Sequence, residues 1–213
     1  MFLEQIIEND SVLEQIDMRK KSHISLGNYL INAMNLTELQ QHRKAFLIGC
    51  ILPDCKPSFV TKRHEFQETY GEVQEMIRML TGDWQFMVES PKAFWLRTGE
   101  VLHFVADYFT YPHNTGYEGS LKDHCMYEKR LKYYLRFYIF SGRVWKNREG
   151  IRNYSDVLEL FLYIEESHRQ YLNESHHVER DARYITNVCL QVISGMYQLI
   201  DDRMRAAGYA AAA

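Results

Sequence analysis

The sequence predicts an all-α protein that forms a single-domain helical bundle. Apolar residues recur with a helical period nearly everywhere, and no stretch of two-residue alternation is bounded by hairpin turn signals. With 213 residues, 46% of them hydrophobic and 25% charged, the chain is long enough to bury a sizeable core without disulfides. We expect one domain over residues 1–209, followed by an alanine tail, 210–213, without a function of its own.

Capping residues and apolar spacing indicate where the helices lie. Ser22 is a suitable N-cap for a helix over residues 22–33, and a shorter helix over residues 44–52 should end at Pro53, where Pro53 and Pro57 bracket a loop. Pro91 suits the first turn of a later helix. The remaining predicted helices cover residues 63–80, 91–110, 120–140, 155–173 and 178–204, and the last two are amphipathic.

Charge and cysteine usage narrow the class of protein. A formal net charge of -3 provides no basic field for nucleic acid, so we expect no stable nucleic-acid partner. The first twenty residues interleave acidic and apolar residues, unlike an export signal, and no run approaches the ~20 apolar residues of a membrane span. The four cysteines form no CxxC pair and are expected to be buried thiols: Cys50, Cys55, Cys125 and Cys189. A cytoplasmic protein without a transmembrane segment is predicted.

Histidines paired with carboxylates are the strongest chemical signal in the sequence. His103 and Asp107 are four residues apart, so on a helix both project from one face and can hold the same cation. His113 follows Pro112, which ends or bends the helix and can turn His113 toward a second cation.

The next predicted helix repeats this spacing with His124 and Glu128. One such pair alone is usually an ordinary hydrogen-bonded pair, but ordinary packing gives no reason to collect two pairs and a third histidine. Imidazole and carboxylate ligands without a thiolate favour a catalytic zinc site, with an open coordination position, over a closed structural site.

These motifs resemble the zinc-dependent phospholipase C and P1 nuclease superfamily, an all-helical fold with up to three zinc ions. The matching pattern is His-x3-Asp-x5-His at His103, Asp107 and His113, followed by His-x3-Glu at His124 and Glu128. Upstream, the resemblance extends to Pro53-Asp54, to His64 and to His23. The motifs cover about half of the chain, in the order that the family shows.

The resemblance implies a ligand set for each ion. Asp54, His64, His103 and Asp107 would hold one zinc, and His113, His124 and Glu128 a second. In the family a third zinc is bound by the bridging Asp, by a His that matches His23, and by the backbone of an N-terminal Trp. This sequence has no Trp ahead of His23, so two zinc ions are expected and the third site needs another ligand.

Such a site suits hydrolysis of a phosphodiester. Three carboxylates against two Zn²⁺ leave a positive site that attracts a phosphate ester and lowers the pKa of bound water from 15.7 to about 7, so that zinc-bound hydroxide can attack phosphorus. We predict a metal-dependent phosphoric diester hydrolase of the phospholipase C type, with Asp54 as the catalytic residue that orients or deprotonates the water. We expect the substrate to be a small phosphoester or a phospholipid headgroup.

Three alternatives remain open at this stage: a P1-type nuclease or nucleotidase, a helical protein that uses its metals without catalysis, and a di-iron carboxylate bundle. The last rests on the Glu-x-x-His pairs at Glu100 and His103 and at Glu165 and His168. The other histidines, His42, His168, His176 and His177, are expected to be solvated and inert. The aromatic run over residues 133–140 is expected to pack against neighbouring helices rather than to contact lipid. The oligomeric state is left open.

Overall fold

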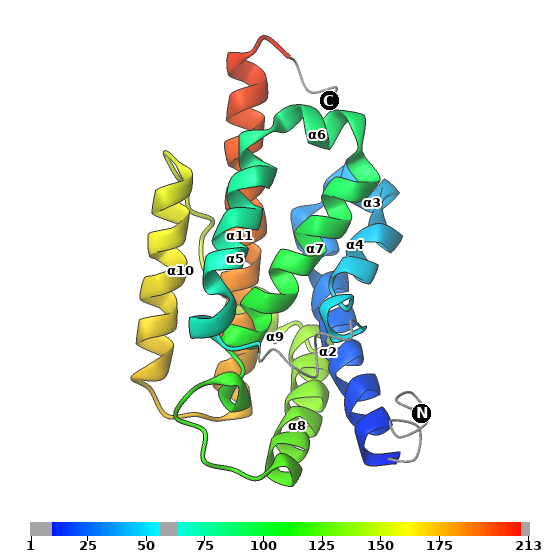
Figure 1. The fold of residues 1–213 in the computed structure, drawn as a ribbon, viewed down its shortest axis with the longest axis vertical. Coiled ribbons are helices and arrows are strands. Elements are labelled where there is room, and N and C mark those ends of the chain that lie inside the picture. The colour runs from blue at the N-terminus through cyan, green and yellow to red at the C-terminus, as the bar shows by residue number, and fades with distance from the viewer. Residues whose placement is uncertain (1–9, 56–63, 210–213) are drawn as a thin grey trace.

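The computed structural model describes residues 10–55 and 64–209, with side chains in the first helix described from residue 20 onward. Within these residues the chain forms helices and no strand, which confirms the all-α prediction (Figure 1). The α-helices are α2 (Asp10–Met34), α3 (Thr37–Gln41), α4 (Arg43–Gly49), α5 (Phe66–Gly82), α6 (Trp84–Glu89), α7 (Pro91–Tyr108), α8 (Leu121–Phe140), α9 (Arg143–Lys146), α10 (Val157–Leu172) and α11 (Val178–Ala206). Two short 3-10 turns, η1 (Pro53–Cys55) and η3 (Tyr111–His113), connect them at the site described below.

Helix α7 lies at the centre of the bundle, where it packs against α4, α5, α6 and α11, while α2 packs against α8, α11 and α4 (Figure 1). Pro91 occupies the first turn of α7, as predicted, and twelve residues of α7 are buried. A pair of glycines brings α4 and α7 into backbone contact: a Cβ on Gly99 would overlap the Phe46 carbonyl oxygen, and one on Gly49 the Leu96 carbonyl oxygen. Only glycine allows this approach.

The helix boundaries differ from the predicted ones in places. The first helix was predicted to start at Ser22, but it runs from Asp10, so Ser22 lies inside it. The segment before Ser22 is composed largely of good helix formers, which explains the longer helix. Asn35 ends it in the left-handed region with φ of 50°. Helix α8 begins behind Ser120 in a capping box with Asp123, as its predicted start requires. Helices α3, α6 and α9 are too short to give a periodic signal and were not predicted. Pro57, Arg63 and the alanine tail lie outside the described residues.

Two expectations about burial are wrong in part. Cys50 and Cys189 are buried thiols, but Cys55 is exposed and Cys125 is partly exposed. The aromatic run does not pack as a whole: Tyr138 is buried, whereas Tyr133, Phe137 and Phe140 are exposed. Among the described elements, α8 packs chiefly against α2 and α11, and the exposure of Tyr133, Phe137 and Phe140 places these rings outside those contacts.

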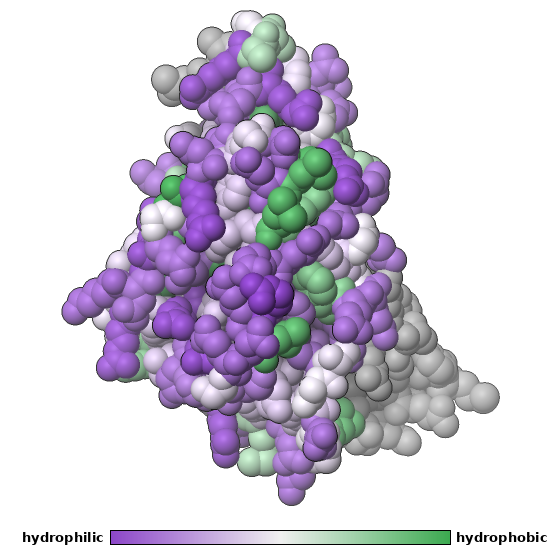
Figure 2. Space-filling model, turned by 90° about the vertical axis from the view of Figure 1, so that its left-hand side faces the viewer, coloured by the Kyte–Doolittle hydropathy of each residue, from purple (hydrophilic) through white to green (hydrophobic). Residues whose placement is uncertain are grey.

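The surface on the α10 side is mostly hydrophilic, and its apolar residues are separated from one another (Figure 2). Among the described residues, no helix has both the length and the apolar character needed to cross a bilayer.

Candidate metal centre

Helix α7 delivers the first half of the centre. His103 and Asp107 lie one turn apart on its last part and are 0% and 5% exposed. Other elements bring three more predicted ligands to this point: Asp54 from η1, His64 from the residues just before α5, and His23 from the middle of α2. All five side chains are buried, so segments far apart in the sequence meet in the interior of the bundle.

Asp107 is the side chain around which the imidazoles gather. Its carboxylate oxygens lie 3.0 Å from His64 Nδ1 and 3.3 Å from His23 Nε2. They also lie 3.4 Å from His103 Nε2 and 3.7 Å from His113 Nδ1. Four imidazoles surround this one carboxylate, so Asp107 is the acidic centre of the cluster.

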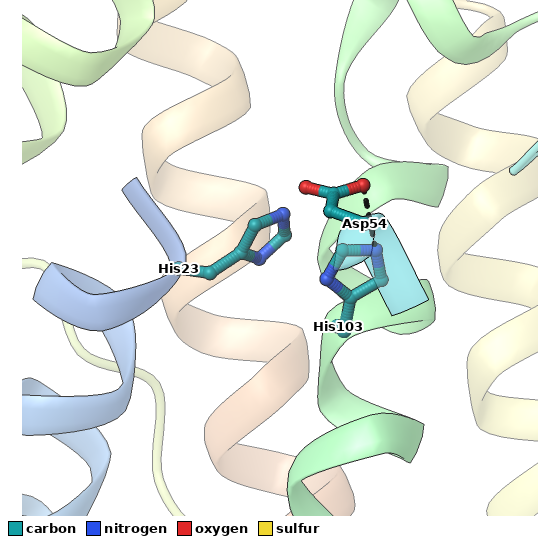
Figure 3. Close-up of side chains that lie close together, drawn as sticks. All are labelled: His23, Asp54 and His103. Carbon is teal, nitrogen blue, oxygen red and sulfur yellow. Dashed lines mark ion pairs between the residues drawn. The ribbon is translucent and has the colours of Figure 1, made fainter. Parts of the chain in front are cut away.

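Asp54 is the least satisfied polar group of the site. It is 3% exposed, and neither of its carboxylate oxygens accepts a hydrogen bond. Its Oδ1 atom lies 3.6 Å from His103 Nε2 (Figure 3). The same atom lies 3.7 Å from His64 Nδ1. A buried carboxylate without a hydrogen bond is costly, which makes Asp54 a side chain that gains from a cation beside it.

The second half of the centre comes from η3 and α8. His113 Nε2 and His124 Nε2 lie 3.0 and 2.9 Å from the same oxygen of Glu128. The other ring nitrogen of His113 faces Asp107, so this imidazole connects the two halves. His113 and Glu128 are each 6% exposed, whereas the side chain of His124 is 18% exposed and lies at the edge of the site.

The electrostatics of the site are those of a coupled acid–imidazole cluster. Burial alone would raise the pKa of Asp107, but the His113 and His103 imidazoles hold it well below its ordinary value. Burial alone would lower the pKa of His103, but Asp107 and Asp54 outweigh it and raise that pKa to about 9. His23 behaves differently: burial and the neighbouring His103 lower its pKa.

All eight predicted side chains therefore converge. Their potential ligand atoms form three groups with spacings under 4.8 Å: His23, Asp54 and His103; His64, His103 and Asp107; His113, His124 and Glu128. The last group is the predicted second set. The first predicted set is divided between two groups that share His103, and His23 lies beside Asp54 (Figure 3). That these residues ligate metal stays a prediction.

Two supports of the site were missed by sequence reasoning. The Cys50 carbonyl oxygen lies 2.9 Å from His103 Nδ1 and orients that ring. Asp181, buried in α11, accepts hydrogen bonds from the backbone N–H of Tyr111 at 3.0 Å and from the hydroxyls of Tyr127 and Tyr171 at 2.7 and 2.9 Å. It thereby anchors the 3-10 turn that carries His113. A partner about seventy residues away leaves no spacing signal.

His168 is a further correction. It was expected to be exposed, but it is 7% exposed, donates from Nε2 to the Asn114 side-chain oxygen at 2.9 Å, and stacks on Phe66. The predicted solvation holds for His177 alone, because His42 and His176 are partly buried. Of the di-iron pairs, Glu165 is exposed, and neither it, Glu100 nor His168 belongs to a potential ligand group in the described ranges. The structure does not assemble the di-iron arrangement there.

The described chain is an all-helical bundle that buries imidazoles and carboxylates in one mixed cluster. These two features define its class, a helical protein with a candidate multinuclear metal centre. The family model for zinc-dependent phospholipase C matches residues 22–178, well over half of the chain. The protein belongs to the zinc-dependent phospholipase C family. Comparison with curated proteins and with solved structures finds no match.

Proposed function

We propose that this protein is a zinc-dependent phosphodiesterase of the phospholipase C type, with the eight converging side chains as its metal ligands. The observation that carries the proposal is the surrounding of Asp107 by four imidazoles, with the unsatisfied carboxylate of Asp54 beside them. Membership of a zinc-dependent family supports the choice of metal. The matched segment contains all eight residues.

The residues present fit zinc. Neutral imidazoles and carboxylates are ligands that zinc accepts at catalytic sites, and the three groups contain no cysteine that would indicate a closed structural site. Bound zinc would supply a Lewis acid for the phosphoryl oxygens and lower the pKa of a coordinated water toward 7. We assign His113, His124 and Glu128 to one ion and Asp54, His64, His103 and Asp107 to the other, and His23 is the additional donor for a third.

The chain's own groups divide the remaining tasks. Asp54 has two oxygens without hydrogen-bond partners, so one oxygen remains to orient water or accept its proton when the other is a ligand. The Cys50 carbonyl and Asp181 hold His103 and the turn of His113 in place. Beside the centre is a cavity of about 30 Å³ whose polar wall includes His23, Asp107 and Glu128. It has room for a water molecule beside these side chains.

The substrate we favour is a phospholipid headgroup or another small phosphoester, as the family description suggests. Nuclease or nucleotidase activity is the enzymatic alternative. A protein that binds zinc without hydrolysing diesters is the non-catalytic candidate, which the turnover experiment below separates from the hydrolase. A cytoplasmic location remains part of the proposal.

Turnover by the zinc-loaded protein tests the proposal. We expect hydrolysis of at least one member of a panel of phosphatidylcholine, phosphatidylethanolamine, bis-p-nitrophenyl phosphate and a dinucleotide, with activity lost on chelation and restored by zinc. His103→Ala should remove activity by at least about a hundredfold while circular dichroism remains helical. Zinc without turnover on any diester would favour the non-catalytic candidate.

Glu165→Ala is the matched control, because Glu165 is an exposed carboxylate with a hydrogen bond from Gln74 and lies outside the ligand groups. Activity and zinc content should match those of the unaltered protein. Loss of metal in this variant, together with iron in place of zinc, would support the di-iron bundle and contradict the proposal.

A further inference from the structure

The chain between Glu128 and Glu149 carries seven cationic residues and no acidic one, although the whole protein has a formal net charge of -3. This segment forms the second half of α8, the turn at Gly142 and helix α9, which pack against each other. Among the side chains described, those of residues 20–55 and 64–209, Arg136, Arg143 and Arg148 form no ion pair with an acidic group. The positive charge of these three arginines is therefore not neutralised by any carboxylate whose side chain the structure describes.

Large aromatic side chains are exposed on the same segment. Tyr133, Phe137 and Phe140 follow the i, i+4, i+7 spacing of one helical face and are 56%, 50% and 82% exposed. Trp145 on α9 is 48% exposed. Single exposed apolar residues are normal, but four aromatic residues within thirteen positions form a feature that needs an explanation.

Cations and rings are interleaved on this surface, which we call the basic–aromatic surface and define by Tyr133, Arg136, Phe137, Phe140, Arg143, Trp145 and Arg148. Arg143 lies 4.9 Å from the Phe137 ring centroid, and Arg148 lies 5.9 Å from that of Trp145. Lys132 lies 4.6 Å from the Tyr133 ring. Each of these three rings thus has a cationic side chain over one of its faces.

A groove continues the surface toward α2. It has a volume of about 640 Å³ and is lined by Lys20 and Asn28 of α2, Arg136 and Phe140 of α8, and Trp145 of α9, among others. Its walls combine cationic and amide groups with aromatic rings. A phosphate group with an apolar tail attached would find both kinds of partner there.

We propose that the basic–aromatic surface docks the protein on the surface of an anionic lipid bilayer. Exposed Phe and Trp side chains enter the boundary between headgroups and acyl chains, and each Lys or Arg near the surface contributes electrostatic attraction to anionic headgroups. The combination of both is what distinguishes such a surface from a solvated helix face.

Two other occupants fit less well. A second copy of this chain would bring two acid-free cationic surfaces together, which like charges oppose. Single-stranded nucleic acid uses exposed ring faces for base stacking, but cations already cover a face of Tyr133, Phe137 and Trp145. An anionic bilayer needs only the ring edges and the charges, and the surface supplies both.

The surface is separate from the candidate metal centre. Phe137 follows Glu128 by nine residues, and at 100° per residue it lies half a turn around α8 from that carboxylate. Docking therefore brings the protein to the membrane without covering the ligand groups. The inference rests on binding alone and stands whether or not the protein hydrolyses a diester.

Vesicle flotation of the full-length, zinc-loaded protein tests the inference. The probes are vesicles of pure phosphatidylcholine and vesicles with about 30% phosphatidylglycerol, and lipid phosphorus is measured afterwards so that hydrolysis is scored separately. We expect at least tenfold tighter binding to the anionic vesicles, weakened at least fivefold when the salt concentration rises from about 0.1 to 0.5 M.

Two double variants separate the contributions. Phe140→Ser with Trp145→Ser removes insertion, and Arg136→Gln with Arg143→Gln removes charge; each should weaken binding to anionic vesicles at least tenfold. Leu158→Ser with Leu162→Ser is the control, because these residues are 57% and 62% exposed on α10, and its binding should stay within twofold. Thermal unfolding of all three variants should match that of the unaltered protein, since every altered side chain is exposed.

Equal binding to both vesicles, or no binding to either, would overturn the inference. So would a dimer in solution that Phe140→Ser with Trp145→Ser dissociates, or binding of a single-stranded oligonucleotide more tightly than of anionic vesicles. Turnover in solution without vesicle binding would contradict the docking surface while leaving the proposed hydrolase intact.

Discussion

His103 Nδ1 lies 2.9 Å from the carbonyl oxygen of Cys50, a group at the C-terminal end of α4 that can only accept. The ring must therefore keep a proton on Nδ1, which leaves Nε2 as the nitrogen for a metal. Nε2 is the atom that faces Asp54 and Asp107. The contact between α4 and α7 thus selects the tautomer of the most buried histidine in the centre, and this contact depends on Gly49 and Gly99.

Gly99→Ala should therefore damage both stability and metal binding. The added Cβ would overlap the Phe46 carbonyl and lie 2.8 Å from Cys50 N, so α4 must move away from α7 and take the Cys50 carbonyl with it. We expect a loss of about 2 kcal/mol or more in the free energy of unfolding and at least about tenfold weaker zinc binding, measured by urea denaturation and by chelator competition.

Gly71→Ala is the matched control for this substitution, because it is also a helical glycine but a Cβ there meets nothing within 4 Å. It should stabilise the protein by about 0.5–1 kcal/mol and leave zinc affinity unchanged. Equal behaviour of the two variants would refute the argument from the close contact of α4 and α7.

Much of this centre is predictable from the sequence, because residues four apart on a helix project from the same face. That spacing alone places His103 with Asp107 and His124 with Glu128. Asp54, His64 and His23 could be named only through the family resemblance, since no local pattern joins residues of α2, η1 and the segment before α5.

Other features were beyond the sequence because they depend on packing between distant helices. The buried state of His168 is set by Phe66 and Asn114, and the support of His113 by Asp181. The exposure of Tyr133, Phe137 and Phe140 could not be predicted without knowing which face of α8 meets its neighbours. Apolar periodicity reports that a helix has a buried side, but a run of aromatic residues covers both sides and removes that signal.

The two halves of the centre should lose metal independently. His64→Ala removes a member of the group with His103 and Asp107, whereas His124→Ala removes a member of the group with His113 and Glu128. Elemental analysis should find about one zinc fewer per chain in each variant and about two fewer in the combined variant. His42→Ala, a partly buried histidine outside the groups, should retain the full zinc content. Complete loss of zinc from either single variant would show one cooperative cluster instead.

Asp54→Asn should separate the free-energy cost of burying this carboxylate from its role as a metal ligand. The shape is kept but the charge is removed from a group without hydrogen bonds, so the zinc-free protein should change in stability by less than about 1 kcal/mol. With zinc at a fixed excess, the stabilisation should fall by at least about 1.4 kcal/mol, because the metal loses an anionic ligand and its affinity drops tenfold or more. Thermal shift with and without zinc measures both values. Equal responses to zinc in the two proteins would remove Asp54 from the ligand set.

His168 should make stability fall in acid. Burial lowers its pKa from 6.5 to about 4, so between these values the unfolded chain binds a proton that the folded chain does not. Its contribution is fully present above pH 6.5 and is lost as the pH falls through about 4, and it amounts to about 3 kcal/mol. His168→Gln keeps a donor for the Asn114 oxygen. Between pH 4 and 7, the free energy of unfolding of this variant, measured by urea denaturation, should change with pH by about 3 kcal/mol less than that of the unaltered protein. Both proteins are measured in chelator so that metal release does not contribute. Parallel pH profiles for the two proteins would mean that His168 takes up its proton without unfolding and that the ring is not held neutral by its burial.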